Sequence, residues 1–158
     1  MYRFVQKTVL AITAALSVGC MSLRAQVPAS VESSGLPVAA KSFIKKHFEG
    51  KTIVKYEKKF WSNSYELELS DGTDLDFDSQ GKCTEVSAPD RGVLPAVLVR
   101  DMLPAEACRT LSDQGALDSV EEIQFHPVKG YKVEVRHDRI DDYRFNAAGQ
   151  MTRVTRDD

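Results

Sequence analysis

The feature that most constrains this chain is an alternating stretch from Tyr65 to Val86 that recurs in related form downstream. Its sequence is YELELSDGTDLDFDSQGKCTEV, in which apolar and polar residues alternate on either side of Asp71-Gly72. Period-two alternation is typical of β-strands with one buried face and one wet face. The second stretch, YKVEVRHDRIDDYRFNAAGQMTRV, runs from Tyr131 to Val154. The chain is therefore predicted to build the same kind of antiparallel sheet twice.

The pattern of the first stretch also predicts how its strands pair. A three-residue loop that ends in a left-handed Gly72 places Leu67 opposite Leu75 and Tyr65 opposite Phe77. A two-residue loop would mix the two faces, because a slip of one residue turns every side chain over. We therefore expect the three-residue loop.

The neighbouring strands follow from the same reasoning. Before the hairpin, KTIVKYEKKF is predicted to be a strand with Val54, Tyr56 and Phe60 in period two. After it, Gly81 makes the next turn and places Cys83 inward. Val86 then requires a β-bulge if it is to face inward as well.

A helical segment precedes each set of strands. In LPVAAKSFIKKHFEG, Pro37 suits the first turn, apolar residues recur at helical spacing, and Gly50 can end the helix. In VLPAVLVRDMLPAEACRTLSD, Pro95 begins a helix and Pro104 interrupts it, which predicts two short helices. The predicted fold is α+β: two tandem helix-plus-four-strand repeats, an antiparallel sheet with helices on one face, and the other face open. The short hinge between the repeats favours one continuous, curved sheet.

The first 25 residues are predicted to be a signal peptide. Arg3 and Lys7 precede an apolar run that is too short to span a bilayer, and cleavage after Ala25 would remove it. The alternative is a lipid anchor at Cys20, which Ser17 disfavours because such motifs prefer leucine there. We expect a periplasmic or secreted protein without a transmembrane segment in the mature chain. The remaining predicted boundaries are a flexible lead-in (26–35), a first repeat (36–88), a hinge (89–93) and a second repeat (94–158).

Composition limits the partners and the redox chemistry. The chain has 21 basic and 23 acidic residues. The leader holds three of the basic residues and none of the acidic ones, which leaves 18 against 23 and a net charge of −5. Nucleic-acid binding is not predicted, because neutralising phosphates requires a basic surface. Cys83 and Cys108 remain after export, and an oxidising compartment permits a disulfide that their spacing neither establishes nor excludes.

The mature chain resembles the PepSY-like, beta-lactamase-inhibitor-like periplasmic proteins of Bacteroides-type bacteria. The residues that carry the resemblance are Leu36-Pro37, Phe43-Ile44, Phe48, Tyr65-Glu66, Asp71-Gly72, Phe77 and Gly81. The second copy matches more loosely, because its helix is broken and its turn HDRID is longer. Where the family has an aromatic residue after the second glycine, Cys83 and Met151 stand here. The resemblance implies an α+β fold with an open sheet face and a binding or inhibitory role with no stated target.

The sequence offers no reaction centre. His126 and His137 have no serine or cysteine partner in a nucleophile motif, and no paired metal-ligand spacing accompanies them. We therefore predict no catalytic residue, no metal and no cofactor.

One acidic run echoes the spacing of a calcium loop. Asp74, Asp76 and Asp78 alternate, and Glu85 stands at the twelfth position. The position that requires glycine holds Ser79, and no helices flank the segment. A solvated acidic strand is the preferred interpretation, and calcium binding remains open as the alternative.

The predicted register sets like charges opposite each other on the outer face. Glu66 falls opposite Asp76, and Glu68 falls opposite Asp74. Such pairs destabilise a sheet unless solvent screens them or cations approach them. The outer face must therefore be wet, or be met by positive charge.

The open face is the predicted binding surface, acidic in one half and mixed to basic in the other. Its outward residues are predicted to be Glu66, Glu68, Asp74, Asp76 and Asp78 in the first copy, and Lys132, Glu134, Arg136, Arg144 and Arg153 in the second. The simplest interpretation is a solvated face. The functional interpretation is a two-signed recognition surface with an aromatic anchor near its rim. The candidate partner-binding residues are Phe60, Trp61, Glu66, Glu68, Asp74, Asp76, Lys132, Arg136 and Arg144.

The predicted function is an exported, non-catalytic binding module that contacts another envelope protein, as an inhibitor or regulator, through the open sheet face. The alternative is an envelope protein that binds a small ligand or a cation such as calcium.

Overall fold

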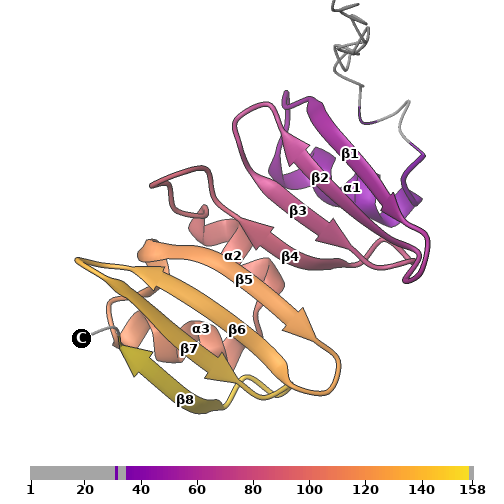
Figure 1. Cartoon of the computed structure of the whole chain (residues 1–158). Coiled ribbons are helices and arrows are strands. Elements are labelled where there is room, and N and C mark those ends of the chain that lie inside the picture. The colour runs from indigo at the N-terminus through magenta and orange to yellow at the C-terminus, as the bar shows by residue number, and fades with distance from the viewer. Residues whose placement is uncertain (1–30, 32–34, 157–158) are drawn as a thin grey trace, which may run out of the picture.

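The structure is a computed structural model that describes residue 31 and residues 35–156 (Figure 1). Within these residues the helices are α1 (Val38–His47), α2 (Ala96–Met102) and α3 (Ala105–Asp113), with a short 3-10 helix η1 (Leu117–Ser119). The strands are β1 (Ile53–Lys59), β2 (Ser64–Leu69), β3 (Asp74–Phe77), β4 (Cys83–Ser87), β5 (Val120–His126), β6 (Gly130–Arg136), β7 (Ile140–Phe145) and β8 (Met151–Arg156). The predicted signal peptide (1–25) and nearly all of the predicted lead-in (26–35) lie outside the described residues.

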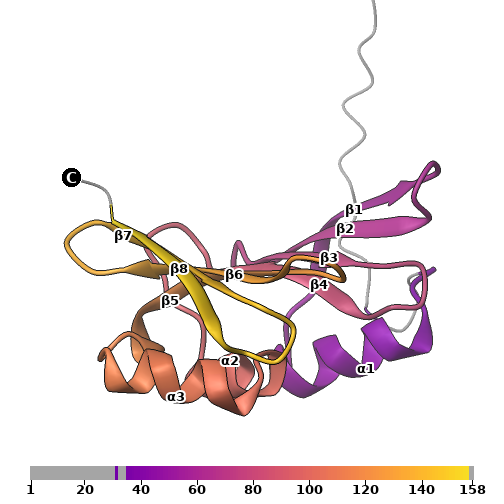
Figure 2. The ribbon, with the colours of Figure 1, turned by 90° about the horizontal axis from the view of Figure 1, so that it is seen from below.

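All eight strands form one antiparallel sheet in the order of the sequence, from β1 to β8. The helices lie on one face of this sheet and leave the other face open (Figure 2). The α+β class and the continuous sheet are therefore confirmed.

The predicted register of the first hairpin is confirmed. Leu67 pairs with Leu75 and Tyr65 pairs with Phe77. The Leu69 N–H donates to the Thr73 carbonyl at 2.8 Å, which closes a three-residue loop (70–72) that ends in Gly72, whose φ is +86°. A left-handed backbone carries no steric cost at glycine, because glycine has no Cβ.

The bulge predicted from Val86 is also present. Cys83 pairs with Phe77, whereas Glu85 pairs with Asp76, so one residue of β4 is left over between them. This extra residue turns the rest of β4 by one position. Val86 consequently faces the core and is fully buried.

Two predicted details of the strands are wrong. β1 contains a bulge between Ile53 and Lys55, so the buried residue at its start is Ile53, with 2% of its surface exposed, and not Val54. Two adjacent apolar residues leave period two ambiguous, and the bulge decides it. The sequence pattern also predicts a strand from Asp118 to Phe125, but Asp118 is part of η1 and β5 begins at Val120.

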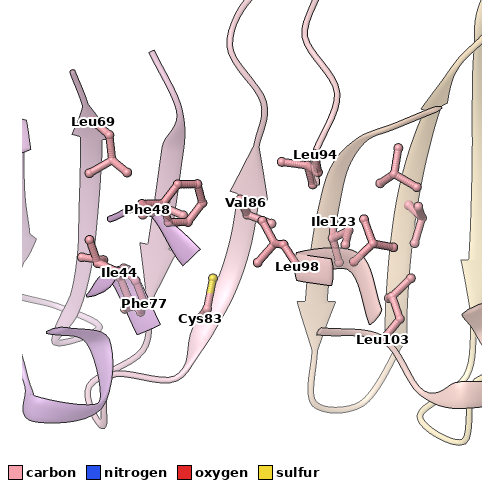
Figure 3. Close-up of a cluster of buried hydrophobic side chains, with 14 of the residues drawn as sticks. Ile44, Phe48, Leu69, Phe77, Cys83, Val86, Leu94, Leu98, Leu103 and Ile123 are labelled. Carbon is pink, nitrogen blue, oxygen red and sulfur yellow. The ribbon is translucent and has the colours of Figure 1, made fainter. Parts of the chain in front are cut away.

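An apolar row crosses the covered face of the sheet from edge to edge. Its directly paired residues are Tyr56, Leu67, Leu75, Val86, Ile123, Val133, Tyr143 and Val154. The pair formed by Val86 and Ile123 joins the two halves, and both side chains are fully buried. Leu94 and Leu98 lie beside Val86 in this part of the core (Figure 3).

The helices α1 and α3 meet the sheet in the same way. A Cβ at Gly81 would lie 2.8 Å from the Cβ of Pro37, which precedes α1. A Cβ at Gly149 would lie 2.7 Å from the Cβ of Pro104, which precedes α3. Each glycine therefore lets a hairpin approach the start of a helix closely.

Both described cysteines are free. Cys83 is buried on β4, and Cys108 is half-buried on α3. Burial raises the pKa of the Cys83 thiol to about 12 and raises the pKa of Cys108 as well. The disulfide that the sequence left open is absent from this part of the chain. No helix of the described residues is long and apolar enough to cross a membrane.

Replacing Gly81 by alanine tests the close approach of hairpin and helix. The new Cβ would meet Pro37 and the backbone nitrogen of Ala40, both at 2.8 Å, with φ at +84°. We expect a loss of about 3 kcal/mol in the free energy of unfolding, measured by urea denaturation. Gly50→Ala is the matched control, because Gly50 has φ +78° but nothing within 4 Å of the added Cβ, and it should cost only about 1 kcal/mol. Equal losses in the two variants would contradict the packing argument.

Candidate functional site

The candidate site is the sheet face that the helices leave open. In Figure 2 both ends of the sheet rise away from the helices, which makes this face concave. The β1–β2 hairpin forms one raised end, and β7 and β8 form the other. Alternation along the strands places the outward candidates on this face, because their chain neighbours are the residues of the buried apolar row.

A second row of directly paired residues crosses the open face, and its charge changes sign along the way. From β1 to β8 the paired residues are Glu57, Glu66, Asp76, Glu85, Gln124, Lys132, Arg144 and Arg153. Four acidic residues are followed by one neutral residue and then by three basic residues. We call this set the charged row.

Five of the seven neighbouring pairs in the charged row carry like charges. Each like-charged pair directly opposed across a sheet costs a few tenths of a kcal/mol or more. The acidic half shows the consequence most clearly. Burial and the nearby carboxylates of Glu66 and Asp74 raise the pKa of Asp76 to about 6. Burial, Glu122 and Asp76 raise the pKa of Glu85 to about 7.

Cations reach the outer end of the acidic half but not its centre. Lys59 Nζ lies 3.0 Å from a carboxylate oxygen of Glu57 and 3.0 Å from one of Glu66. Among the described residues, neither Asp76 nor Glu85 takes part in an ion pair. Asp76 and Glu85 are therefore half-buried carboxylates without a cation partner among the described residues.

In the basic half of the charged row, the positive charges are paired with acidic residues that lie beside the row. Lys132 forms an ion pair with Glu134 and lies 3.9 Å from Glu122. Arg144 Nη2 donates to Asp142 Oδ2 at 2.9 Å. These pairs orient the cations, while Arg144 and Arg153 still stand opposite each other as like charges.

The remaining candidates occupy the edges of the site. Arg136 pairs with Glu121 at the far end of β6. Glu68 and Asp74 face each other across β2 and β3 as predicted. Burial and the charge of Glu68 raise the pKa of Asp74.

Two hollows lie on the open face and share Glu85 in their walls. The first has a volume of about 360 Å³ and the second about 640 Å³. Charged residues of the first are Lys55, Glu66, Asp74, Asp76 and Glu85, and those of the second are Glu85, Lys129, Lys132 and Arg144. The two hollows therefore differ in the sign of most of their charged groups.

The aromatic candidates project freely into solvent. Trp61 is fully exposed at 102%, and Phe60 is 83% exposed, in the turn between β1 and β2. Phe60 therefore lies beyond the end of β1 and not within the predicted strand, and Trp61 does not pack over the edge of the sheet. Exposed aromatic side chains of this size mark contact surfaces more often than isolated aliphatic residues do.

Sequence reasoning missed two acidic groups and misplaced one. Glu85 belongs to the centre of the charged row, a position that follows from the bulge required by Val86. Glu122 lies next to Glu85 across the seam between β4 and β5. Burial and the nearby charge of Glu134 raise the pKa of Glu122. Asp78 instead serves the turn after β3, where its Oδ1 accepts the backbone N–H groups of Gln80 and Lys82 at 2.9 Å each.

The calcium-loop spacing does not fold into a cage, because Asp78 is held in that turn. In the part of the chain that the structure describes, no group of three or more His, Cys, Asp or Glu residues is placed to hold a metal ion. His126 ends β5, and its Nδ1 accepts the backbone N–H groups of Val128 and Lys129. His137 lies exposed in the turn between β6 and β7.

The raised pKa values predict how stability depends on pH. The folded state holds protons on Asp76 and Glu85 at pH values where the unfolded chain has lost them, so the free energy of unfolding should fall as pH rises from about 4 to about 7. After a discount for solvent screening, we expect a loss of about 1–2 kcal/mol in total. Asp76→Asn with Glu85→Gln should flatten this dependence, as measured by urea denaturation at each pH.

His47 adds a further pH dependence of stability, which is the same in the parent protein and in the double variant. Burial lowers its pKa, so it contributes stability that rises with pH over part of the same range. Comparison of the double variant with the parent cancels this contribution. Glu49→Gln, an exposed site on the helix side, is the matched control. Parallel pH curves for parent and double variant would contradict the assignment.

Comparisons with known proteins agree with this architecture. Residues 25–85 match the family model described as "Putative beta-lactamase-inhibitor-like, PepSY-like". No curated protein matches the chain. The match to the family ends at residue 85, so it covers the first half of the sheet and does not extend to the second.

Solved structures from Bacteroides share the fold across both halves. One is a "putative calcium-regulated periplasmic protein" from Bacteroides thetaiotaomicron, 23% identical, with a TM-score of 0.65 over 81% of this chain and 94% of that chain. Another is a "putative periplasmic protein of unknown function" from Bacteroides vulgatus, 24% identical, with a TM-score of 0.62 over 77% of this chain and 92% of that chain. At these identities the likeness shows the fold alone. The resemblance to the PepSY-like, beta-lactamase-inhibitor-like family is confirmed over residues 25–85.

Proposed function

We propose that this protein is an exported, non-catalytic binding module that captures another envelope protein on its open sheet face. The observation that carries the proposal is the combination of a concave, polar sheet face with a fully exposed aromatic turn at its raised end. Protein interfaces are typically anchored by a few aromatic side chains and ringed by polar groups. Inhibition or regulation of the captured protein would follow from covering its surface.

The location and the repeat organisation belong to the same proposal. Proteins of this fold from Bacteroides are described as periplasmic, which supports export of this chain after cleavage of residues 1–25. The boundaries 36–88, 89–93 and 94–158 describe two tandem copies joined by a hinge. The equivalent contacts of Gly81 with Pro37 and of Gly149 with Pro104 support the two copies. They also suggest that α2 is an addition to the second copy, with α3 as the counterpart of α1.

The open face itself holds the proposed contact residues. We assign partner binding to Phe60 and Trp61 in the turn, to the four acidic candidates on β2 and β3, and to Lys132, Arg136 and Arg144 on β6 and β7. The four acidic candidates are Glu66, Glu68, Asp74 and Asp76. All nine occupy the open face or its rim, which leaves the helix-covered face free of any proposed contact.

Calcium binding is the second candidate function. It is favoured by the description of one structural neighbour as calcium-regulated and by the uncompensated carboxylates of Asp76 and Glu85. If it holds, millimolar calcium should raise the melting temperature, and Asp76→Asn should weaken that rise, because each carboxylate ligand adds to calcium affinity. A melting temperature that calcium leaves unchanged would contradict this role.

Truncation of the aromatic turn tests the binding role. We expect the immobilised protein to recover a specific partner from envelope extract, identified by mass spectrometry, and Trp61→Ala to reduce recovery strongly. Loss of an anchoring tryptophan typically costs 2 kcal/mol or more, which is about a 30-fold loss of affinity. Because Trp61 is fully exposed, its removal should leave the melting temperature unchanged.

Val38→Ala is the matched control, since Val38 is an apolar side chain with 79% exposure on α1, on the opposite side of the sheet. This variant should recover the partner as the parent does. Recovery of no partner above background, or equal recovery by the Trp61→Ala variant, would contradict the proposed function.

A further inference from the structure

The charged row indicates which charges a partner would carry, because the register of the sheet fixes where the row changes sign. The acidic members belong to β1–β4 and the basic members to β6–β8, with Gln124 between them. A face that has only to remain soluble gains stability by opposing unlike charges across neighbouring strands. This row does the reverse in five of its seven pairs. Separation of the signs is therefore unfavourable in the free protein and favourable only against a complementary surface.

The protein could neutralise the row internally but does so only in part. Lys59 reaches Glu57 and Glu66 at the edge, and no described cation pairs with Asp76 or Glu85 in the middle. Opposite Arg144, the row places Arg153 and not an acid. Like charges therefore remain side by side at Asp76 and Glu85, in the centre of the acidic half, and at Arg144 and Arg153, at the edge of the basic half.

The shape of the face agrees with the charge. The smaller hollow lies over β1–β4, the larger one spans the seam between β4 and β5, and both are lined by Glu85. Their volumes, about 360 Å³ and about 640 Å³, are large enough to admit side chains of a partner. A concave face fits a convex surface, so the concave face of a second copy of this chain is a poor occupant.

We propose that the occupant of the open face is a convex protein surface that is positively charged where it meets β1–β4 and negatively charged where it meets β6–β8. This inference rests on the proposed function and adds to it the chemistry and the orientation of the partner. The midpoint of the Asp76 and Glu85 pair lies three strand spacings from that of the Lys132 and Arg144 pair, which is about 14 Å. The partner's groups of opposite sign should be separated by a similar distance. The row sets their order, so the partner can dock in only one direction.

The pKa values of the acidic half agree with this chemistry. Asp76 and Glu85 have pKa values raised to about 6 and about 7, largely because burial disfavours their charged forms. A cationic group placed beside them would favour the charged forms again. Binding should therefore release protons near pH 6 and strengthen as pH rises toward 8.

Two short peptides of one composition test the separation of charge. The first, acetyl-KKAADD-amide, places its lysines and aspartates about 13 Å apart when extended, and the second, acetyl-KDAAKD-amide, mixes them. We expect NMR titration of the ¹⁵N-labelled protein at low salt to show about fivefold tighter binding of the first peptide. The amide signals of Asp76 and Arg144 should shift together with it, and added salt should remove the preference.

Variants of the row supply the decisive comparison. The double variant Asp76→Lys with Glu85→Lys makes the centre of the row basic and should lose the preference. Addition of Lys132→Glu and Arg144→Glu reverses the four central charges of the row and should restore the preference, because a flexible peptide can lie in either direction. Glu49→Lys, on the helix side, is the matched control and should retain the parent's preference.

The outcomes separate this inference from the proposed function. Equal binding of the two peptides by the parent protein would overturn the charge-divided partner, as would a preference that the double variant keeps. Either result could occur while Trp61-dependent capture from extract succeeds, and the proposed function would then stand. If the double variant does not fold, loss of the parent's preference in high salt supports the inference, and its persistence contradicts it.

Discussion

The pairing of β4 with β5 is the interaction on which the rest of the structure depends. Only three residue pairs form it, Glu85 with Gln124, Val86 with Ile123 and Ser87 with Glu122. Its middle pair is fully buried, so it links the apolar rows of the two halves into one core. A single sheet then has a single uncovered face, and residues from both halves share that face. Without this seam the acidic and basic groups would lie on separate bodies, and the charged row would not exist.

The seam in turn depends on β-bulges. The bulge after Cys83 turns Val86 inward, and the bulge between Val120 and Glu122 brings β5 into register with β4. The pairing of β1 with β2 also contains a bulge, next to Ile53, and so does the pairing of β8 with β7, next to Phe145. A bulge inserts one residue and increases the local twist, which is a recurrent way to curve a sheet. The same irregularities that complete the core thus also contribute to the concavity of the open face.

Much of the fold could be predicted because apolar residues alternate cleanly in most strands. The loop that ends in Gly72 and the bulge before Val86 both followed from the requirement that apolar side chains share one face. Prediction failed where the pattern was ambiguous, as at Ile53 and Val54, which are both apolar. The charged row was beyond reach for a different reason. Its outward residues could be named one by one, but their alignment across the seam depends on how β4 meets β5, and no turn of fixed length connects those strands.

Burial does not explain the like-charged neighbours on the open face. Burial on the covered face determines which residues point outward, but it leaves the signs of their charges free. The second half shows that this chain can compensate a charge locally, as Lys132 with Glu134 and Arg144 with Asp142 do. The first half leaves Asp76 and Glu85 uncompensated at the same level of the sheet, at a cost visible in their raised pKa values. Packing therefore accounts for where these carboxylates lie but not for their charge, and this uncompensated charge is the feature that the proposed partner surface would explain.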